Sequence, residues 1–87
     1  MTFANLIRFN QDSNIYVSEL DAGKSIEFDV ATGRQAYLLC IEGKLNVNSE
    51  LLEERDAIEI RGGLKLALSA PQDSKAHLLI VEMQSEI

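Results

Sequence analysis

An alternation of apolar and polar side chains that recurs along the chain most constrains its fold. In a β-strand, successive side chains point to opposite faces of the sheet, so a period of two indicates a strand with one buried face. The pattern is clear in Ser25–Val30, Leu45–Asn48, Ala57–Ile60 and Leu64–Ser69. Because these apolar positions do not repeat at helical spacing, the sequence predicts an all-β fold.

Two further segments, Tyr37–Ile41 ("YLLCI") and Leu78–Val81 ("LLIV"), are apolar on both faces. Such runs are typical of central strands, or of strands whose second face meets a partner. Earlier strands are predicted at Leu6–Phe9 and Asn14–Leu20. Turn residues separate these segments, and strands spaced in this way are typical of a sandwich or barrel.

The remaining helix candidate, "SELLEERDA", has too few apolar positions at helical spacing to form a buried helix. The core is therefore expected to come from alternate positions of the strands. The predicted core residues are Leu39, Ile41, Leu45, Val47, Ile58, Ile60, Leu66, Leu68, Leu79 and Val81.

Size and charge limit the classes of partner. The 87 residues predict one domain, residues 1–87, and the net charge of −6 without a basic patch argues against nucleic-acid and membrane-surface binding. Cys40 is the single cysteine, so no internal disulfide can form. No secretion signal or membrane-spanning run is visible, and a cytoplasmic location is expected.

Several local features together resemble one family. The chain combines a "QD…IY" opening, an "AG" turn, "GR-A" before an apolar strand, and the later patterns "G-L-VN" and "L-…DA-I". From about Leu6 to Met83 it is similar to the C-terminal cupin domain of bacterial pirin-like proteins, the quercetinase-type bicupins. The resemblance implies a small antiparallel β-barrel of jelly-roll type with two packed sheets. It also implies that metal and dioxygenase chemistry belong to an N-terminal cupin.

The cupin motifs implied by this resemblance have lost their metal ligands. The glycine frame falls on Gly23, Gly43 and Gly63, while the loop glycine expected before Asp56 is Arg55. A transition metal in a cupin needs converging imidazole nitrogens and a carboxylate. The ligand places here hold Asp29, Ala31, Ala36 and Leu66. Because two alanines and a leucine offer no lone pairs, and one carboxylate cannot hold a transition metal, these residues predict a cupin with no metal and no other cofactor.

The alternation of apolar and polar residues conflicts with a metal-ligand role for Asp29, the first of these ligand places. Ile26, Phe28 and Val30 form the apolar set of their strand, so simple alternation puts Asp29 on the polar face. If Asp29 is to point into the barrel, either the strand contains a bulge or its apolar set meets something outside the barrel. The second alternative predicts a protein contact.

Four other residues are candidates for a ligand wall or an interface: Tyr16, Phe28, Arg34 and Tyr37. Tyrosine is enriched at interfaces, and ordinary strand packing is the alternative reading for both tyrosines. Arg34 follows Gly33 in a predicted turn. It either binds an anionic ligand at the barrel mouth or lies in solvent.

The other polar side chains favour ordinary roles. His77 is the only histidine and is expected to be satisfied by water or a backbone group. Cys40 is expected to be a buried, inert thiol, with a reactive thiol as the alternative. The acidic residues match no calcium-loop spacing and are expected to form a solvated face: Glu50, Glu53, Glu54 and Asp56.

Three functions stay open. The first is a non-catalytic, metal-free module with a structural, dimerisation or interaction role, whose partner is a second copy or an N-terminal cupin domain. The second is a metal-free cupin that binds a small apolar ligand in its barrel. The third is the accessory part of a quercetin 2,3-dioxygenase-like enzyme. In each case the chain alone is not expected to be an enzyme.

Overall fold

In the computed structural model, residues 4–10 and 13–84 are described, and they form strands joined by turns. The strands are β1 (Ala4–Asn10), β2 (Ser13–Leu20), β3 (Ser25–Val30), β4 (Arg34–Gly43), β5 (Leu45–Val47), β6 (Glu50–Leu52), β7 (Ala57–Arg61), β8 (Leu64–Ser69) and β9 (Ala76–Gln84). Every predicted strand is present, and β6 occupies part of the rejected helix candidate. No helix in these residues is long and apolar enough to cross a membrane.

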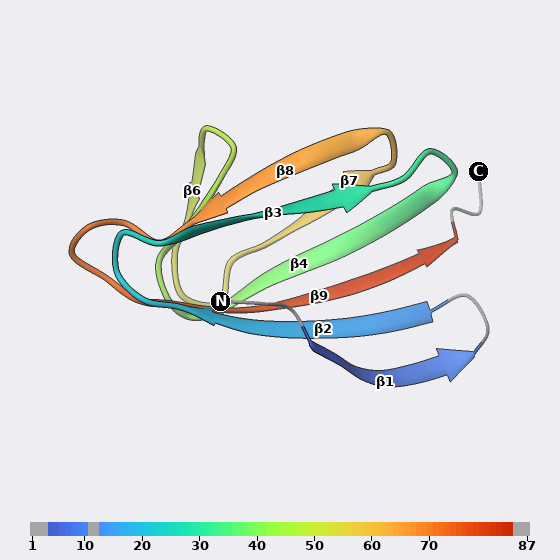
Figure 1. Cartoon of the computed structure of the whole chain (residues 1–87), viewed down its shortest axis with the longest axis horizontal. Coiled ribbons are helices and arrows are strands. Elements are labelled where there is room, and N and C mark those ends of the chain that lie inside the picture. Colours follow the sequence, from blue (N-terminus) through green and yellow to red (C-terminus); the bar gives the residue numbers. More distant parts are fainter. Residues whose placement is uncertain (1–3, 11–12, 85–87) are drawn as a thin grey trace.

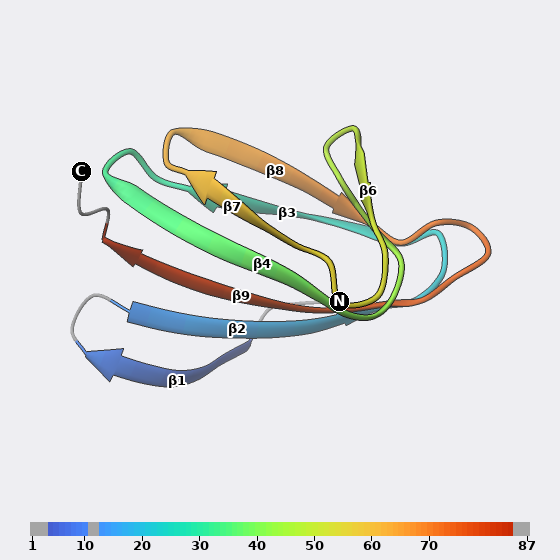
Figure 2. The same cartoon turned by 180° about the vertical axis from the view of Figure 1, so that it is seen from behind.

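The strands form two sheets that pack face to face (Figure 1). One has the order β1-β2-β9-β4-β7 and the other the order β3-β8-β5-β6, and the pairing inside both is antiparallel. Figure 2 shows the same two layers from behind. The runs that are apolar on both faces are β4 and β9, two of the central strands of the larger sheet. The predicted all-β fold of two packed sheets is confirmed.

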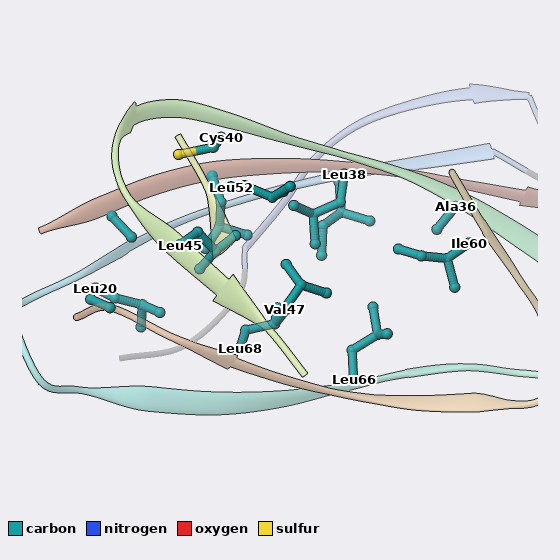
Figure 3. Packing of buried hydrophobic residues seen from close by; sticks show 14 of the residues in the cluster. Leu20, Ala36, Leu38, Cys40, Leu45, Val47, Leu52, Ile60, Leu66 and Leu68 are labelled. Carbon is teal, nitrogen blue, oxygen red and sulfur yellow. The ribbon is translucent and has the colours of Figure 1, made fainter. Parts of the chain in front are cut away.

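Apolar side chains from both sheets fill the space between them (Figure 3). Half of the predicted core residues are buried there: Leu45, Val47, Ile60, Leu66 and Leu68. Ile58 is partly buried and packs against them. The largest fully buried side chains also include Leu20, Leu38, Leu78 and Ile80. The interior is thus packed largely with leucine and isoleucine.

The face predicted for the two central strands is wrong. Leu38 and Cys40 of β4, and Leu78 and Ile80 of β9, are the residues that face the interior, each at 0% exposure. The residues chosen from the sequence lie on the opposite face and are only partly buried: Leu39, Ile41, Leu79 and Val81. Both faces of these strands are apolar, so hydrophobicity alone could not select the inward one.

Two glycines hold the strand connections at points of close backbone approach. Gly43 has a positive φ of 79°, and a Cβ there would overlap the carbonyl oxygen of Lys75. At Gly62 a Cβ would overlap the carbonyl oxygen of Ala31. A side chain at either position would push two segments apart, because backbone atoms cannot give way as a flexible side chain can.

Candidate functional site

The four residues at the predicted ligand places do not converge. Ala36 and Leu66 are buried in the interior, whereas Asp29 and Ala31 are exposed. β3 pairs with β8 without a register shift, and Asp29 lies opposite Lys65. Both readings offered for this strand, a bulge and an outward-facing apolar set, are therefore wrong. Its apolar residues face the core.

Carbon side chains occupy the positions of β3 that do face the interior. Phe28 and Val30 each lie one residue before a predicted ligand place, and Phe28 pairs with Leu66 across the sheet. The rings of Tyr16 and Phe28 meet edge-on, with centroids 5.4 Å apart and planes at 65°. Aromatic pairs favour this arrangement. With Ala36 on the facing sheet, the described side chains around Phe28 offer no set of nitrogen or carboxylate ligands.

A transition metal therefore does not fit the barrel centre, because it needs several converging nitrogen, oxygen or sulfur ligands. Across residues 4–10 and 13–84, no three histidine, cysteine, aspartate or glutamate side chains are grouped so that they could hold a metal ion.

A polar cluster lies at one end of the larger sheet, which we call the Arg34 end: there β2 and β4 begin and β9 ends. Arg34 donates from Nε to Glu82 Oε2 at 2.6 Å and from its terminal nitrogen to Oε1 at 2.9 Å. Asn14 donates to the same Oε1 at 3.2 Å. The cross-strand register places all three on the interior-facing side, so β2, β9 and β4 are joined by one carboxylate.

The Arg34–Glu82 contact is a bidentate, charge-assisted pair. The side chains are only 23% and 13% exposed, so solvent screens them less than a surface pair. The hydrogen bonds from Arg34 lower the pKa of Glu82, burial acts in the opposite direction, and the Asn14 bond adds to the lowering. Arg34 is thus neither a solvated turn residue nor an open anion site, because its guanidinium group already binds the carboxylate of Glu82 through two nitrogens.

Three of the four candidate wall residues lie on this interior side. Tyr16 and Phe28 touch each other, and Asn14, which joins the Arg34 cluster, is two positions from Tyr16 on the same face of β2. Tyr37 points to the opposite face, is 44% exposed, and donates to Glu59 at 3.3 Å. Sequence reasoning missed Glu82 and Asn14, because Glu82 is 48 residues from Arg34 along the chain and no local pattern links them.

His77 lies at the opposite end of the larger sheet, which we call the His77 end. Its Nδ1 is 3.6 Å from Glu42 Oε1, and its cross-strand partners are Glu19 and Glu42. A cleft of about 260 Å³ at this end is lined by these side chains and by Asp21 and Lys75, among others. At 3.6 Å, Glu42 is a neighbour of His77 and not a hydrogen-bond acceptor, so the expectation that water or a backbone group satisfies His77 stays a prediction. A charged lining does not suit a small apolar ligand.

Two buried groups are chemically quiet. Cys40 is fully buried, and burial, followed by the charges of Asp56 and Glu54, raises the pKa of its thiol. A thiol that stays protonated and covered is not a nucleophile, which agrees with the inert reading. Ser18 is 4% exposed on the interior face of β2, and its hydroxyl has no hydrogen-bond partner in the described part of the chain.

Comparison with protein families and curated sequences gives two matches. The family described as the quercetinase C-terminal cupin domain matches residues 4–83. A Pseudomonas aeruginosa protein named "Putative quercetin 2,3-dioxygenase" is 32% identical over 77 residues, which cover 88% of this chain. The same match covers 32% of that protein, so this chain spans about a third of the length of the curated relative.

Solved structures agree on the architecture. A cupin domain of a transcriptional regulator from Enterobacter cloacae is similar with a TM-score of 0.79, at 12% identity over 98% of this chain and 97% of that one. A cupin protein from Bacteroides fragilis has a TM-score of 0.73 at 16% identity, over 88% of this chain and 70% of that one. At these identities the likeness establishes the cupin fold and nothing about ligand or activity.

Proposed function

The chain belongs to the quercetinase C-terminal cupin domain family, and from this premise we propose that it is a non-catalytic, metal-free cupin module with a structural or interaction role. In this proposal the module is one domain. The observation that carries the proposal is the barrel centre, where Phe28, Ala36 and Leu66 stand at interior positions and Tyr16 packs on Phe28.

Chemistry argues in the same direction. Dioxygen does not react readily with a flavonol unless a redox metal couples the two, and a protein that catalyses this step supplies metal ligands and an open coordination position. Neither Asp29, on the outer surface, nor His77, at the far end of the other sheet, can supply these at the centre. The polar cluster at the Arg34 end of the interior has its carboxylate bound to Arg34.

The activity of the much longer curated relative is assigned by its name to the whole protein, of which this chain matches a third. We propose that the module supports an active domain or a second copy rather than reacting with substrate. The packed interior gives the alternative of an apolar ligand in the barrel no support. The cytoplasmic location and the absence of nucleic-acid or membrane partners stay predictions from charge and the lone cysteine.

The test combines metal content and activity. Elemental analysis of the untagged 87-residue chain is expected to find substoichiometric iron, copper, nickel, cobalt and manganese. Quercetin loss in the presence of each added metal is expected to equal that of the metal without protein. One tightly held metal per chain would contradict the proposal. So would turnover above the metal-only control that is abolished by His77→Ala or Asp29→Ala.

A further inference from the structure

The outer face of the larger sheet, which points away from the second sheet, is apolar at its centre. We call this centre the outer patch and define it by six residues: Ile15, Val17, Tyr37, Leu39, Leu79 and Val81. Tyr37 is 44% exposed and the others are partly buried. The described strands are all members of the two sheets, and the smaller sheet packs on the opposite, interior face.

The cross-strand register arranges this face in four rows. The two middle rows are Ile15–Val81–Tyr37, which continues onto β7 at Glu59, and Val17–Leu79–Leu39, which continues onto β7 at Ala57. Beyond the first, toward the Arg34 end, lies the row of Met83, Gln35 and Arg61. Beyond the second, toward the His77 end, lies the row of Glu19, His77 and Glu42. The middle of the face is therefore apolar over β2, β9 and β4 and carries Glu59 at its β7 edge. One end of the face is acidic, and the other carries Arg61, the ion-pair partner of Glu59.

We propose that the outer patch binds a second copy of this chain face to face, about a two-fold axis that lies in the interface and runs across the strands. Each Arg34 end then covers the partner's His77 end. This inference rests on the proposed interaction role and deepens it by naming the surface and the occupant. Sheets that pack in this aligned way lie about 10 Å apart, with their strand directions within about 30°.

The area of the face supports a second copy as the occupant. Five strands spaced about 4.8 Å apart and about seven residues long, at about 3.3 Å per residue, project on the order of 550 Å². A specific interface buries about 800 Å² of accessible surface on each partner, about a seventh of the 5363 Å² of this chain. Side-chain relief makes the accessible area exceed the projected one. A dimer of ordinary size therefore needs the whole face, charged outer rows included.

The charged rows select the direction of packing. With the axis across the strands, the Arg61 row of one copy covers the Glu19–His77–Glu42 row of the other, and the two apolar rows cover each other. Arg61 is half exposed, and its present partners are Glu59 at 3.3 Å and Gln35 at 3.0 Å. With the axis along the strands, the glutamates of one copy would face those of the other. Like charges that meet in an interface are strongly unfavourable.

Sedimentation equilibrium of the untagged chain at physiological salt tests the dimer. A dimer with a low-micromolar dissociation constant is expected. Leu39→Glu should raise that constant by at least about tenfold, because it puts a charge in the apolar centre. Leu51→Glu is the matched control, since Leu51 is 50% exposed on β6 of the other sheet, and it should leave association unchanged. Circular dichroism confirms that each variant is folded.

Two further variants keep the test decisive. Tyr37→Asp replaces an exposed residue, so it should weaken the dimer even if Leu39→Glu unfolds the chain. Arg61→Glu should weaken association. Adding Glu42→Arg to the same chain should restore it, because the double variant swaps the charges of the two facing rows and opposite charges meet again. A monomer at tens of micromolar, or a dimer equally sensitive to Leu51→Glu, overturns the inference. A metal-free monomer would overturn the dimer inference and leave the proposed function standing, whereas a tightly bound metal would overturn the proposed function.

Discussion

Removing either partner of the Arg34–Glu82 pair should cost more stability than a surface ion pair contributes. Exposed pairs are worth about 0–1 kcal/mol, while breaking a fully buried pair costs about 3–5 kcal/mol. Here both side chains are mostly covered, the contact is bidentate, and Asn14 adds a third hydrogen bond. Arg34→Met leaves a covered carboxylate with Asn14, and we expect it to destabilise the fold by about 2–3 kcal/mol. Glu82→Gln keeps the size and should cost about 1–2 kcal/mol.

Urea unfolding followed by circular dichroism is the suitable assay, since the chain contains no tryptophan. Protein concentration must be held fixed, because a dimer makes apparent stability depend on it. The double variant should cost less than the sum of the two single variants, with a coupling energy of at least about 1 kcal/mol. If Arg34→Met costs less than about 0.5 kcal/mol with an unchanged urea dependence, the pair behaves as a surface pair and the reasoning fails.

The pH dependence provides an independent check on the same pair. The pKa of Glu82 is lowered in the folded state, so the unfolded chain binds its proton more readily. Stability from the ionised carboxylate is therefore complete above the unfolded pKa of about 4.3, and it is lost as pH falls through the lower folded pKa. The stability difference between the unmodified chain and Glu82→Gln should shrink below about pH 4. A difference that stays constant down to the acid transition would contradict the assignment.

Two substitutions should stabilise the fold. Arg55 has a positive φ of 74°, so Arg55→Gly should gain about 0.5–1 kcal/mol and raise the melting temperature by a few degrees, whereas Arg55→Ala keeps the strain and should gain nothing. An equal gain from both in thermal unfolding would assign the effect to the side chain instead of the backbone. Ser18→Ala removes a buried hydroxyl without a described partner and should gain about 1 kcal/mol by urea unfolding. Ser25→Ala, at an exposed position of β3, is its control. A loss of stability in Ser18→Ala would show that the hydroxyl of Ser18 is hydrogen-bonded in solution.

The alternation in the sequence predicts where the strands lie but not always which face is inward. In β3 and β8 one face is polar, and the prediction that Leu66 and Leu68 are buried is confirmed. In β9 each face carries one charged or titratable residue, His77 on the outer face and Glu82 on the inner face. The sequence therefore does not indicate which face of β9 is buried. In β4 the register shifts between Cys40 and Glu42, which indicates a bulge. Counting back from Glu42 by simple alternation therefore assigns the residues before the bulge to the wrong face.

The ligand places show a related limit of motif matching. Counting from Gly23 places the motif on Asp29, whereas the unbroken pairing of β3 with β8 turns Phe28 and Val30 inward. A one-residue slip in a strand exchanges the two faces, so a motif aligned through a glycine can name the right strand and the wrong side chain. The polar cluster of Arg34, Glu82 and Asn14 lay further beyond sequence reasoning, because its members come from three strands.

Two glycines are required by the backbone whether or not a metal is bound: Gly43 of the glycine frame and Gly62, the neighbour of Gly63. At Gly43 and Gly62 a Cβ would overlap a carbonyl oxygen of another segment, and no change of side chain could relieve that contact. At position 55 only the left-handed φ is demanded, since Asp56 donates to Glu53 and closes a turn whose third residue has φ of 74°. The left-handed φ costs a non-glycine residue about 1–2 kcal/mol, part of which is offset because glycine has more conformational freedom in the unfolded chain, and a folded domain can tolerate the remainder. Arg55 accordingly stands where the family motif has a glycine, whereas glycine stands at the two positions where backbone contact requires it. The backbone contacts are therefore enough to explain glycine at these two positions, without any role in metal binding.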